Sequence, residues 1–215
     1  YLITSNQFLN QKDKYCYGAT QKAITAEGLK KINISIPEKG AQEEVAKVLS
    51  KISYLLVLRR QQIENLDQLV KSRFIEMFGD PGINPYGCDK QILKNTCNVV
   101  TGNTPSRTVE RYYGNYIEWI KTDNIVTGQL NPTIATEYLS EEGIKVGRTV
   151  EKGTILMACI AGSVASIGRV CITDRKVAFN QQINAVIPQK YDPLFLYVML
   201  QISKDYLVQE INMAL

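Results

Sequence analysis

The chain has 215 residues, of which 45% are hydrophobic and 21% charged, a composition typical of a globular protein of one or two domains. It contains no histidine, which excludes Ser-His-Asp and Cys-His catalysis and the commoner zinc sites. No apolar run approaches the roughly 18 residues that a membrane span needs, so we expect no membrane segment.

The net charge is +4, and most of the excess lies in residues 1–40, whereas residues 80–215 are balanced. A polyanion would therefore have to be bound by a local face of Lys and Arg rather than by overall charge. The five cysteines are odd in number and never form C-x-x-C, which predicts reduced thiols and a cytoplasmic location.

Residues 1–40 are predicted to form the closing segment of a domain. Residues 1–17 have the pattern of an amphipathic helix that Gly18 interrupts. Leu29–Pro37 alternates apolar and polar side chains, which predicts a half-buried strand with its three isoleucines facing inward. Because the chain starts at Tyr1 in mid-pattern, we expect it to be cut from something longer.

Residues 41–79 predict one long helix. There is no Pro or Gly between Ala41 and Phe78, good helix formers dominate, and Gly79 followed by Pro81 ends the pattern. About 37 residues at 1.5 Å each give a helix of about 55 Å, which must bury its apolar stripe against a partner helix. A core helix of one globular domain is the alternative interpretation.

Apolar residues recur along this helix at the 3.5-residue spacing of a coiled-coil seam. One heptad line holds Leu49, Leu56, Ile63, Val70 and Met77, and the adjacent line holds Val45, Ile52, Arg59, Leu66 and Arg73. The residues expected to make the spacer contacts are Leu49, Ile52, Leu56, Ile63, Leu66 and Val70.

Residues 80–215 follow a Pro/Gly-rich connector at 80–92 and predict a domain of short strands. The expected strands are 97–101, 116–120, 153–160, 167–172 and 179–187, and a helix is expected at 193–214. The candidate core positions of that helix are Leu194, Leu196, Val198, Leu200, Leu207, Val208 and Ile211. Tyr197–Leu215 repeats the pattern of residues 1–17, which suggests a duplicated domain whose second copy lacks its closing segment.

The local motifs carry no catalytic signature. Asn84-Pro85-Tyr86 is similar to the base-gripping loop of amino-methyltransferases, but one proline and the Gly-rich cofactor turn are missing, so we interpret it as a linker turn. Gly102–Arg107 lacks the spacing of a nucleotide-binding loop, although its polar side chains would suit phosphate oxygens or base edges. As an isolated string it is more simply interpreted as a surface loop.

Two further stretches are ambiguous. Trp119 stands at a predicted strand end before Lys121 and Asn124, and a core anchor is its default interpretation. The amides of residues 180–182 could pair with adenine, or they could cap the local backbone.

Taken in order, several short motifs resemble the specificity (S) subunit of bacterial type I restriction-modification systems. The resemblance covers nearly the whole chain. Its motifs are Gly102-x-Thr104-Pro105-Ser106, Tyr116-Ile-x-Trp119 with Asp123, Leu139-Ser140-x-x-Gly143, Gly153-Thr-Ile-Leu, Ile167-Gly168, Phe179-Asn180-Gln181, Tyr17-Gly-x-x-Gln21-Lys22, Ile34-x-Ile36-Pro37, and the helix from Gln42-Glu43 to Met77-Phe78-Gly79-Asp80.

The resemblance implies an α+β fold with a mixed-β target-recognition domain (80–215), a spacer helix (41–79) that pairs in an antiparallel coiled coil, and the end of another recognition domain (1–40). It implies a non-catalytic chain that reads a split site on double-stranded DNA and docks modification subunits, which carry S-adenosylmethionine, and restriction subunits, which use ATP. No cofactor or metal is expected on the chain itself. The candidate DNA contacts are Lys22, Thr104, Ser106, Arg107, Lys121, Asn124, Arg169 and Gln181.

The chain departs from the family layout because it has one spacer and only one nearly complete recognition domain. We therefore expect an antiparallel homodimer through residues 42–77, in which residues 1–40 of one copy complete residues 80–215 of the other. An excerpt of a two-domain subunit is the competing account. A dimeric coiled-coil adaptor that never touches DNA is the alternative function, and a catalytic methyltransferase is a third.

Overall fold

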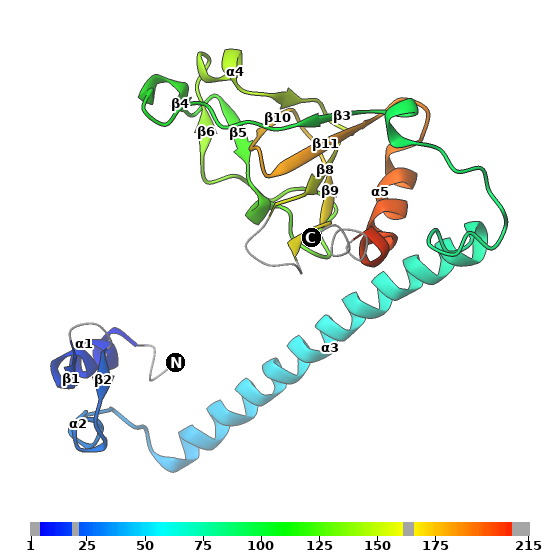
Figure 1. Ribbon diagram of the computed structural model, residues 1–215. Coiled ribbons are helices and arrows are strands. Elements are labelled where there is room, and N and C mark those ends of the chain that lie inside the picture. The colour runs from blue at the N-terminus through cyan, green and yellow to red at the C-terminus, as the bar shows by residue number, and fades with distance from the viewer. Residues whose placement is uncertain (1–4, 19–21, 161–165, 208–215) are drawn as a thin grey trace. The chain divides into compact units, whose positions relative to one another are not determined.

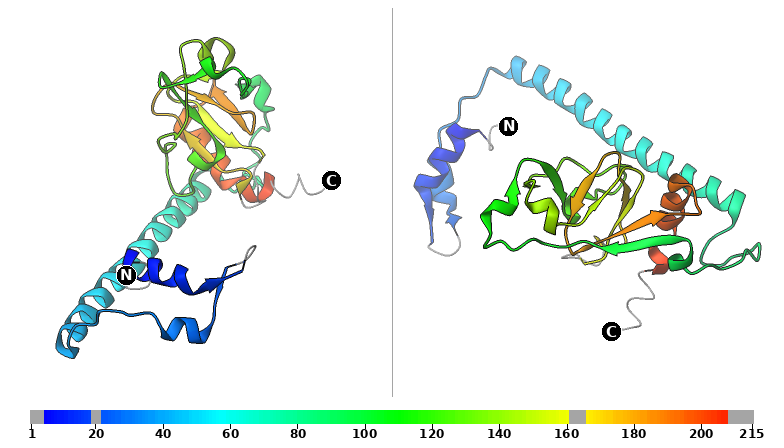
Figure 2. Two further views of the ribbon diagram at one scale, coloured as in Figure 1. Left: turned by 90° about the vertical axis from the view of Figure 1, so that its left-hand side faces the viewer. Right: turned by 90° about the horizontal axis from the view of Figure 1, so that it is seen from above.

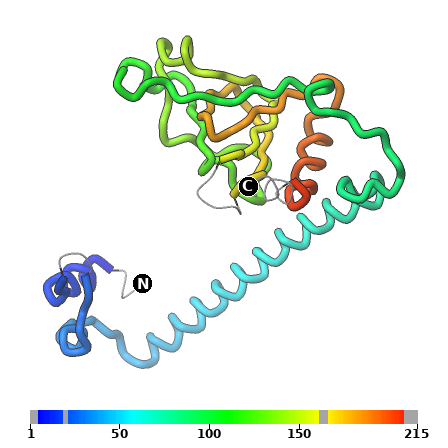
Figure 3. Tube along the Cα trace, in the orientation of Figure 1, coloured from blue at the N-terminus to red at the C-terminus, as the bar shows by residue number. Residues whose placement is uncertain are grey.

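The structure is a computed structural model that describes residues 5–18, 22–160 and 166–207, the coloured parts of the trace in Figure 3. The chain divides into two compact units, Tyr1–Arg60 and Gln61–Leu215. Because this division falls inside a helix, the three-part division predicted from the sequence, 1–40, 41–79 and 80–215, stays a prediction.

The first unit contains two short helices and a small hairpin. Besides the first part of the long helix, its elements are α1 (Asn6–Tyr15), β1 (Cys16–Tyr17), β2 (Ala23–Ile24) and α2 (Ala26–Lys30), and the two strands pair antiparallel. Helix α1 confirms the predicted helix over its described part. Its N-terminus is capped by Ser5, whose hydroxyl accepts a 3.2 Å hydrogen bond from Phe8 N.

The strand predicted at Leu29–Pro37 is wrong. Leu29 lies in α2, and residues 32–38 have no regular secondary structure. Ile34 and Ile36 are 46% and 58% exposed. A strand needs a neighbour for its backbone groups, whereas here the Gln11 side chain bonds both the N–H and the C=O of Asn33, each at 2.9 Å. Alternation alone could not supply a neighbouring strand.

Helix α3 (Lys39–Phe78) is uninterrupted over 40 residues and confirms the predicted long helix (Figure 1). It ends at Gly79, which has a φ of +80° and donates its N–H to Ile75 O at 2.8 Å. The six predicted spacer residues are exposed, from 43% for Leu49 to 61% for Leu66. An apolar stripe of this length requires a covering surface. No helix among the described residues is long and apolar enough to cross a membrane.

The second unit is built on two sheets, seen from several sides in Figures 1 and 2. The five-stranded sheet has the order β4-β6-β5-β10-β7 and the four-stranded sheet the order β3-β11-β8-β9. Only the β5–β10 pair is parallel among the described strands of this unit. Long helix and mixed sheet together confirm the α+β fold class.

The strands are β3 (Cys97–Thr101), β4 (Tyr113–Gly114), β5 (Ile117–Ile120), β6 (Tyr138–Leu139), β7 (Thr149–Val150), β8 (Ile155–Ala158), β9 (Val170–Ile172), β10 (Val177–Phe179) and β11 (Ile183–Pro188). The helical segments are η1 (Leu93–Asn95), η2 (Glu110–Tyr112), η3 (Thr122–Asn124), α4 (Gly143–Val146) and α5 (Pro193–Ile202).

The main core lies between the two sheets. Ile120 and Phe179 of the five-stranded sheet pack with Leu156 and Ile183 of the four-stranded sheet, and all four are fully buried. Apolar burial of this kind is the main stabilising contribution to such a unit.

Helix α5 covers the outer face of the four-stranded sheet through Leu196 and Leu200, which are buried with Ile155 and Val186. Leu196 and Leu200 thus confirm two predicted core positions. Leu194 is 52% exposed and was wrongly placed in the core. Val208 and Ile211 lie outside the described residues.

The strand predicted at 179–187 is two strands that belong to different sheets. Strand β10 ends at Phe179, the chain turns at residues 180–182, and β11 begins at Ile183. The turn is closed by Asn180, whose Oδ1 accepts from Gln182 N at 3.2 Å and whose Nδ2 donates to Gln182 Oε1 at 3.0 Å. The single-strand prediction was wrong because this local cap interrupts the apolar run.

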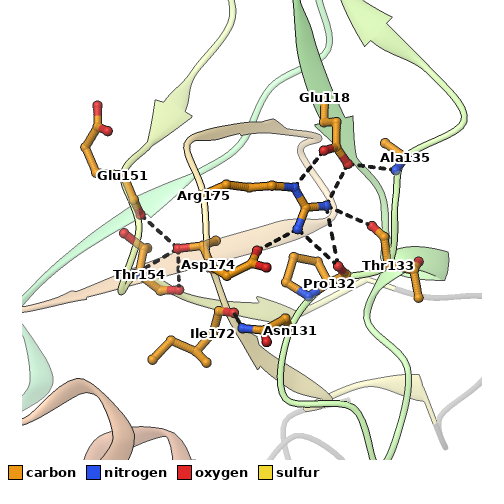
Figure 4. A network of polar contacts seen from close by, with 11 residues as sticks. Glu118, Asn131, Pro132, Thr133, Ala135, Glu151, Thr154, Ile172, Asp174 and Arg175 are labelled. Atoms are coloured by element: carbon orange, nitrogen blue, oxygen red, sulfur yellow. Dashed lines mark hydrogen bonds and ion pairs between the residues drawn. The ribbon is translucent and has the colours of Figure 1, made fainter.

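An ion-pair network fixes the loop before β10 to β5 (Figure 4). Arg175 forms a two-pronged contact with Glu118, Nε to Oε1 at 2.6 Å and Nη2 to Oε2 at 2.7 Å, and also pairs with Asp174. The hydrogen bonds from Arg175 and from Ala135 N lower the pKa of Glu118 against the effect of burial, with the Arg175 bond the largest cause. The paired guanidinium and carboxylate thus connect segments far apart in sequence.

Candidate nucleic-acid interface

Two polar loops of the second unit meet where the chain crosses from one sheet to the other. The loop after β3 begins at Gly102, whose N–H donates to Ile183 O at 2.9 Å, and Asn103 N donates to Phe179 O at 3.2 Å. A Cβ on Gly102 would lie 2.1 Å from Asn180 O, so only glycine fits this approach. The loops that carry Thr104 and Gln181 are therefore side by side.

Asn103 holds the first loop in place with its side chain. Its Nδ2 donates to Val146 O at 2.7 Å, and its Oδ1 accepts from Arg148 N at 2.8 Å. Its carbonyl oxygen lies 3.4 Å from the indole nitrogen of Trp119, and Tyr113 Oη donates to Pro105 O at 2.6 Å. These four contacts fix the loop from β3 to η2 on the sheet.

Polar side chains at the loop tips contact one another. The Thr104 hydroxyl donates to Gln181 Oε1, and both residues are exposed. Ser106 shares a 2.8 Å hydrogen bond with the hydroxyl of Thr108. Four of the predicted DNA contacts, Thr104, Ser106, Arg107 and Gln181, therefore lie on two loops that the fold brings together.

Arg107 lies on two aromatic rings. Its Cζ is 4.5 Å from the ring centre of Tyr113 and 4.9 Å from that of Trp119, and the two rings meet edge to face at 5.9 Å. Such cation–π contacts stabilise one orientation of the guanidinium. The Arg107 side chain is still 54% exposed.

Glu137 joins Arg107 to Lys121. One carboxylate oxygen lies 2.7 Å from Arg107 Nη2, and the other accepts a hydrogen bond from Lys121 Nζ, which also lies 5.2 Å from the Trp119 ring centre. The hydrogen bond from Lys121 is the largest cause that lowers the pKa of Glu137, Arg107 lowers it further, and burial opposes both. Two cations and one carboxylate leave this cluster with one positive charge.

Burial also changes the pKa of Tyr113, the phenol beside Arg107. Desolvation raises the pKa of Tyr113, and the nearby Arg107 charge lowers it in part. Tyr113 therefore stays a neutral hydroxyl that holds the loop through Pro105.

Asn124 and Arg169 have partners within the chain. Asn124 Oδ1 accepts from Lys121 N at 3.0 Å, and its Nδ2 donates to Thr133 Oγ1 at 3.1 Å. Arg169 donates to Thr122 O at 3.3 Å. Both residues fix the backbone next to Lys121, and their predicted DNA contacts are untested.

Lys22 is exposed in the first unit, ahead of β2. Glu137 and Tyr113 belong to no sequence motif, and only the fold brings them to Arg107. Trp119 is 3% exposed, so it is the expected core anchor, yet it also borders both cations. No described group of three or more Cys, Asp or Glu side chains could hold a metal ion.

The type I restriction modification DNA specificity domain matches this chain over residues 1–68 and 89–213. The chain therefore belongs to that family. The curated relatives include the HindI specificity subunit of Haemophilus influenzae, 29% identical over 120 residues that make up 54% of this chain and 25% of that protein. The MjaIX specificity subunit of Methanocaldococcus jannaschii is 29% identical over 126 residues, 56% of this chain and 28% of its own.

The fold is similar to that of the crystal structure of the HsdS subunit from Thermoanaerobacter tengcongensis, with a TM-score of 0.51 and 17% identity over 97% of this chain and 53% of that one. The chain thus spans about a quarter of the length of the curated relatives and about half of the solved structure.

Proposed function

We propose that the chain is a non-catalytic DNA-recognition subunit of a type I restriction-modification complex and reads part of a split target sequence. Membership of the specificity-domain family supports this function. The observation that carries it is the meeting of the 102–107 loop with the 180–182 turn, next to the two cations of Arg107 and Lys121. Polar side chains and cations thus lie together where the chain passes from β10 to β11. They suit hydrogen bonds and ion pairs with DNA phosphates and base edges.

Affinity would come mainly from phosphate contacts, and sequence choice from base edges in a groove. Thr104, Ser106 and Gln181 present hydroxyl and amide groups that suit either role. Lys22, Asn124 and Arg169 are retained as candidate contacts. Because residues 80–215 have equal numbers of acids and bases, binding by the second unit should depend on this local face.

The chemistry belongs to partner subunits in this proposal. Modification subunits would carry S-adenosylmethionine, and restriction subunits would use ATP, while this chain places them on the target in the cytoplasm. The chain itself offers no histidine for acid–base work.

The exposed stripe of α3 supports a homodimer. Its apolar side chains follow two heptad lines, and the end of the stripe is continuous with a groove of about 450 Å³ next to α5, lined by Val70, Phe74, Met77 and Phe195 among others. An antiparallel second copy of α3 would cover both. Residues 1–40 of that copy would then complete residues 80–215 of this one.

Duplex binding by the full chain tests the function. We expect retention on random duplex at low salt, loss as salt rises, and enrichment of one sequence from a random pool. A chain that dimerises but is not retained on duplex at any salt concentration would instead be the coiled-coil adaptor.

A further inference from the structure

The Glu137 carboxylate is shared between two cations at the edge of the candidate interface. Its two oxygens face different partners, Arg107 at 2.7 Å and Lys121. The Oε2 atom of Glu137, which faces Arg107, is buried, whereas the Arg107 side chain is 54% exposed, so the guanidinium can still meet a ligand. The single carboxylate therefore offsets one of the two positive charges before any ligand arrives.

Arg107 is also restrained in orientation. The ring centres of Tyr113 and Trp119 lie 4.5 and 4.9 Å from its Cζ atom, and Glu137 Oε2 lies 2.7 Å from its Nη2 atom. A guanidinium has five N–H donors in a planar fork, so donors remain for a ligand. The usual entropy cost of ordering a long side chain on binding is reduced, because the fold has already ordered it.

Building on the proposed DNA-recognition function, we propose that Glu137 is a positioning residue that makes Arg107 read the base edge of a guanine rather than a phosphate. Guanine offers two neutral acceptors, O6 and N7, at the spacing of two guanidinium donors. A neutral edge can be bound without disturbing the pair with Glu137.

A phosphate would meet the opposite situation. Its charge would lie close to that of Glu137, and like charges repel across a partly buried site. The phosphate would have to compete with the carboxylate for the same guanidinium. Arg107, paired with Glu137, would thus favour a neutral guanine edge over a phosphate.

Selection from a random duplex pool with the full chain tests this assignment. The wild type should enrich a guanine at one fixed position. Arg107→Lys keeps the charge but loses the fork, so it should lose that preference by about 5- to 150-fold while keeping its affinity for random duplex. Glu137→Gln should weaken the same preference, raise random-duplex binding and steepen the salt slope by about one.

Glu151→Gln is the matched control, because Glu151 pairs with Lys176 at 2.6 Å and belongs to neither polar loop. It removes the same charge and should leave the guanine preference intact. Circular dichroism of each variant verifies folding, and Arg107→Lys tests the assignment even where Glu137→Gln fails to fold.

Two failures are distinguishable. A wild-type chain that enriches no sequence would overturn the proposed function together with this inference. An enriched sequence that Arg107→Lys retains unchanged, or that contains no guanine at the position it alters, would overturn the guanine assignment alone.

Discussion

Gly102 and Asn180 approach so closely that a Cβ on Gly102 would lie 2.1 Å from the Asn180 carbonyl oxygen. It would also lie 2.6 Å from Phe179 O, and both obstacles are backbone atoms that cannot rotate away. This contact joins the loop after β3 to the turn between β10 and β11, and it brings Thr104 next to Gln181.

We therefore expect Gly102→Ala to destabilise the second unit by about 2–4 kcal/mol, because the backbone must shift to accept the methyl group. Urea unfolding followed by circular dichroism measures the change. Gly40→Ala is the control, since nothing lies within 4 Å of its Cβ position in α3 and alanine favours helix. Equal stability of Gly102→Ala and wild type would contradict the contact.

The Glu118–Arg175 pair should make stability depend on pH. The pKa of Glu118 is lowered in the folded state, so its contribution is full above the unfolded value near 4.5 and is lost as pH falls through the folded pKa. Glu118→Gln should be less stable than wild type at pH 7, by about 1–3 kcal/mol, since it leaves Arg175 poorly paired.

The difference between Glu118→Gln and wild type should shrink below pH 4.5, where the wild-type carboxyl takes up its proton. Thermal melts from pH 3 to 7 measure it. Glu151→Gln, which breaks an exposed pair, is the comparison and should melt like wild type. A constant difference at all pH values would argue against the pair.

Three phenylalanines pack the C-terminal end of α3 against α5. The Phe195 ring centre lies 5.5 Å from that of Phe74 and 5.1 Å from that of Phe78. We expect Phe195→Ala to cost about 2–3 kcal/mol, less than a fully buried Phe because the side chain is partly exposed.

Leu194→Ala is the matched control for Phe195→Ala, because the neighbouring Leu194 is 52% exposed. It should change the unfolding free energy little. Limited proteolysis of the connector that follows Gly79 also reports the packing of α3 on α5. Phe195→Ala should accelerate this cleavage. Equal unfolding free energies and cleavage rates for the two variants would show that the aromatic cluster does not stabilise the unit.

The proposed dimer depends on the apolar stripe of α3. Leu56 and Ile63 are 56% and 55% exposed on one heptad line. Replacing both with Lys should convert a dimer to a monomer in light scattering at micromolar concentration, because charges cannot be buried in a coiled-coil seam. Tyr54→Lys, off both lines and 64% exposed, should leave the dimer intact. A monomeric wild type would refute the dimer.

Local sequence determined the long helix and the positions of strands β3 and β5. Helix formation depends on neighbours within a few residues, so the absence of Pro and Gly between 41 and 78 sufficed. The loop beginning at Gly102 could likewise be read from its polar residues. The turn at 180–182 could not, because its residues were expected to belong to a single strand over 179–187.

Only the tertiary structure decided what those loops meet. The alternation at 29–37 failed to give a strand because a strand's hydrogen bonds are made with another segment, which no local pattern specifies. Glu137 reaches Arg107 and Lys121 because β6 pairs with β5, a register set by burial across the whole sheet. The sequence therefore specified which side chains are polar, and the packing of the sheets decided which of them act together.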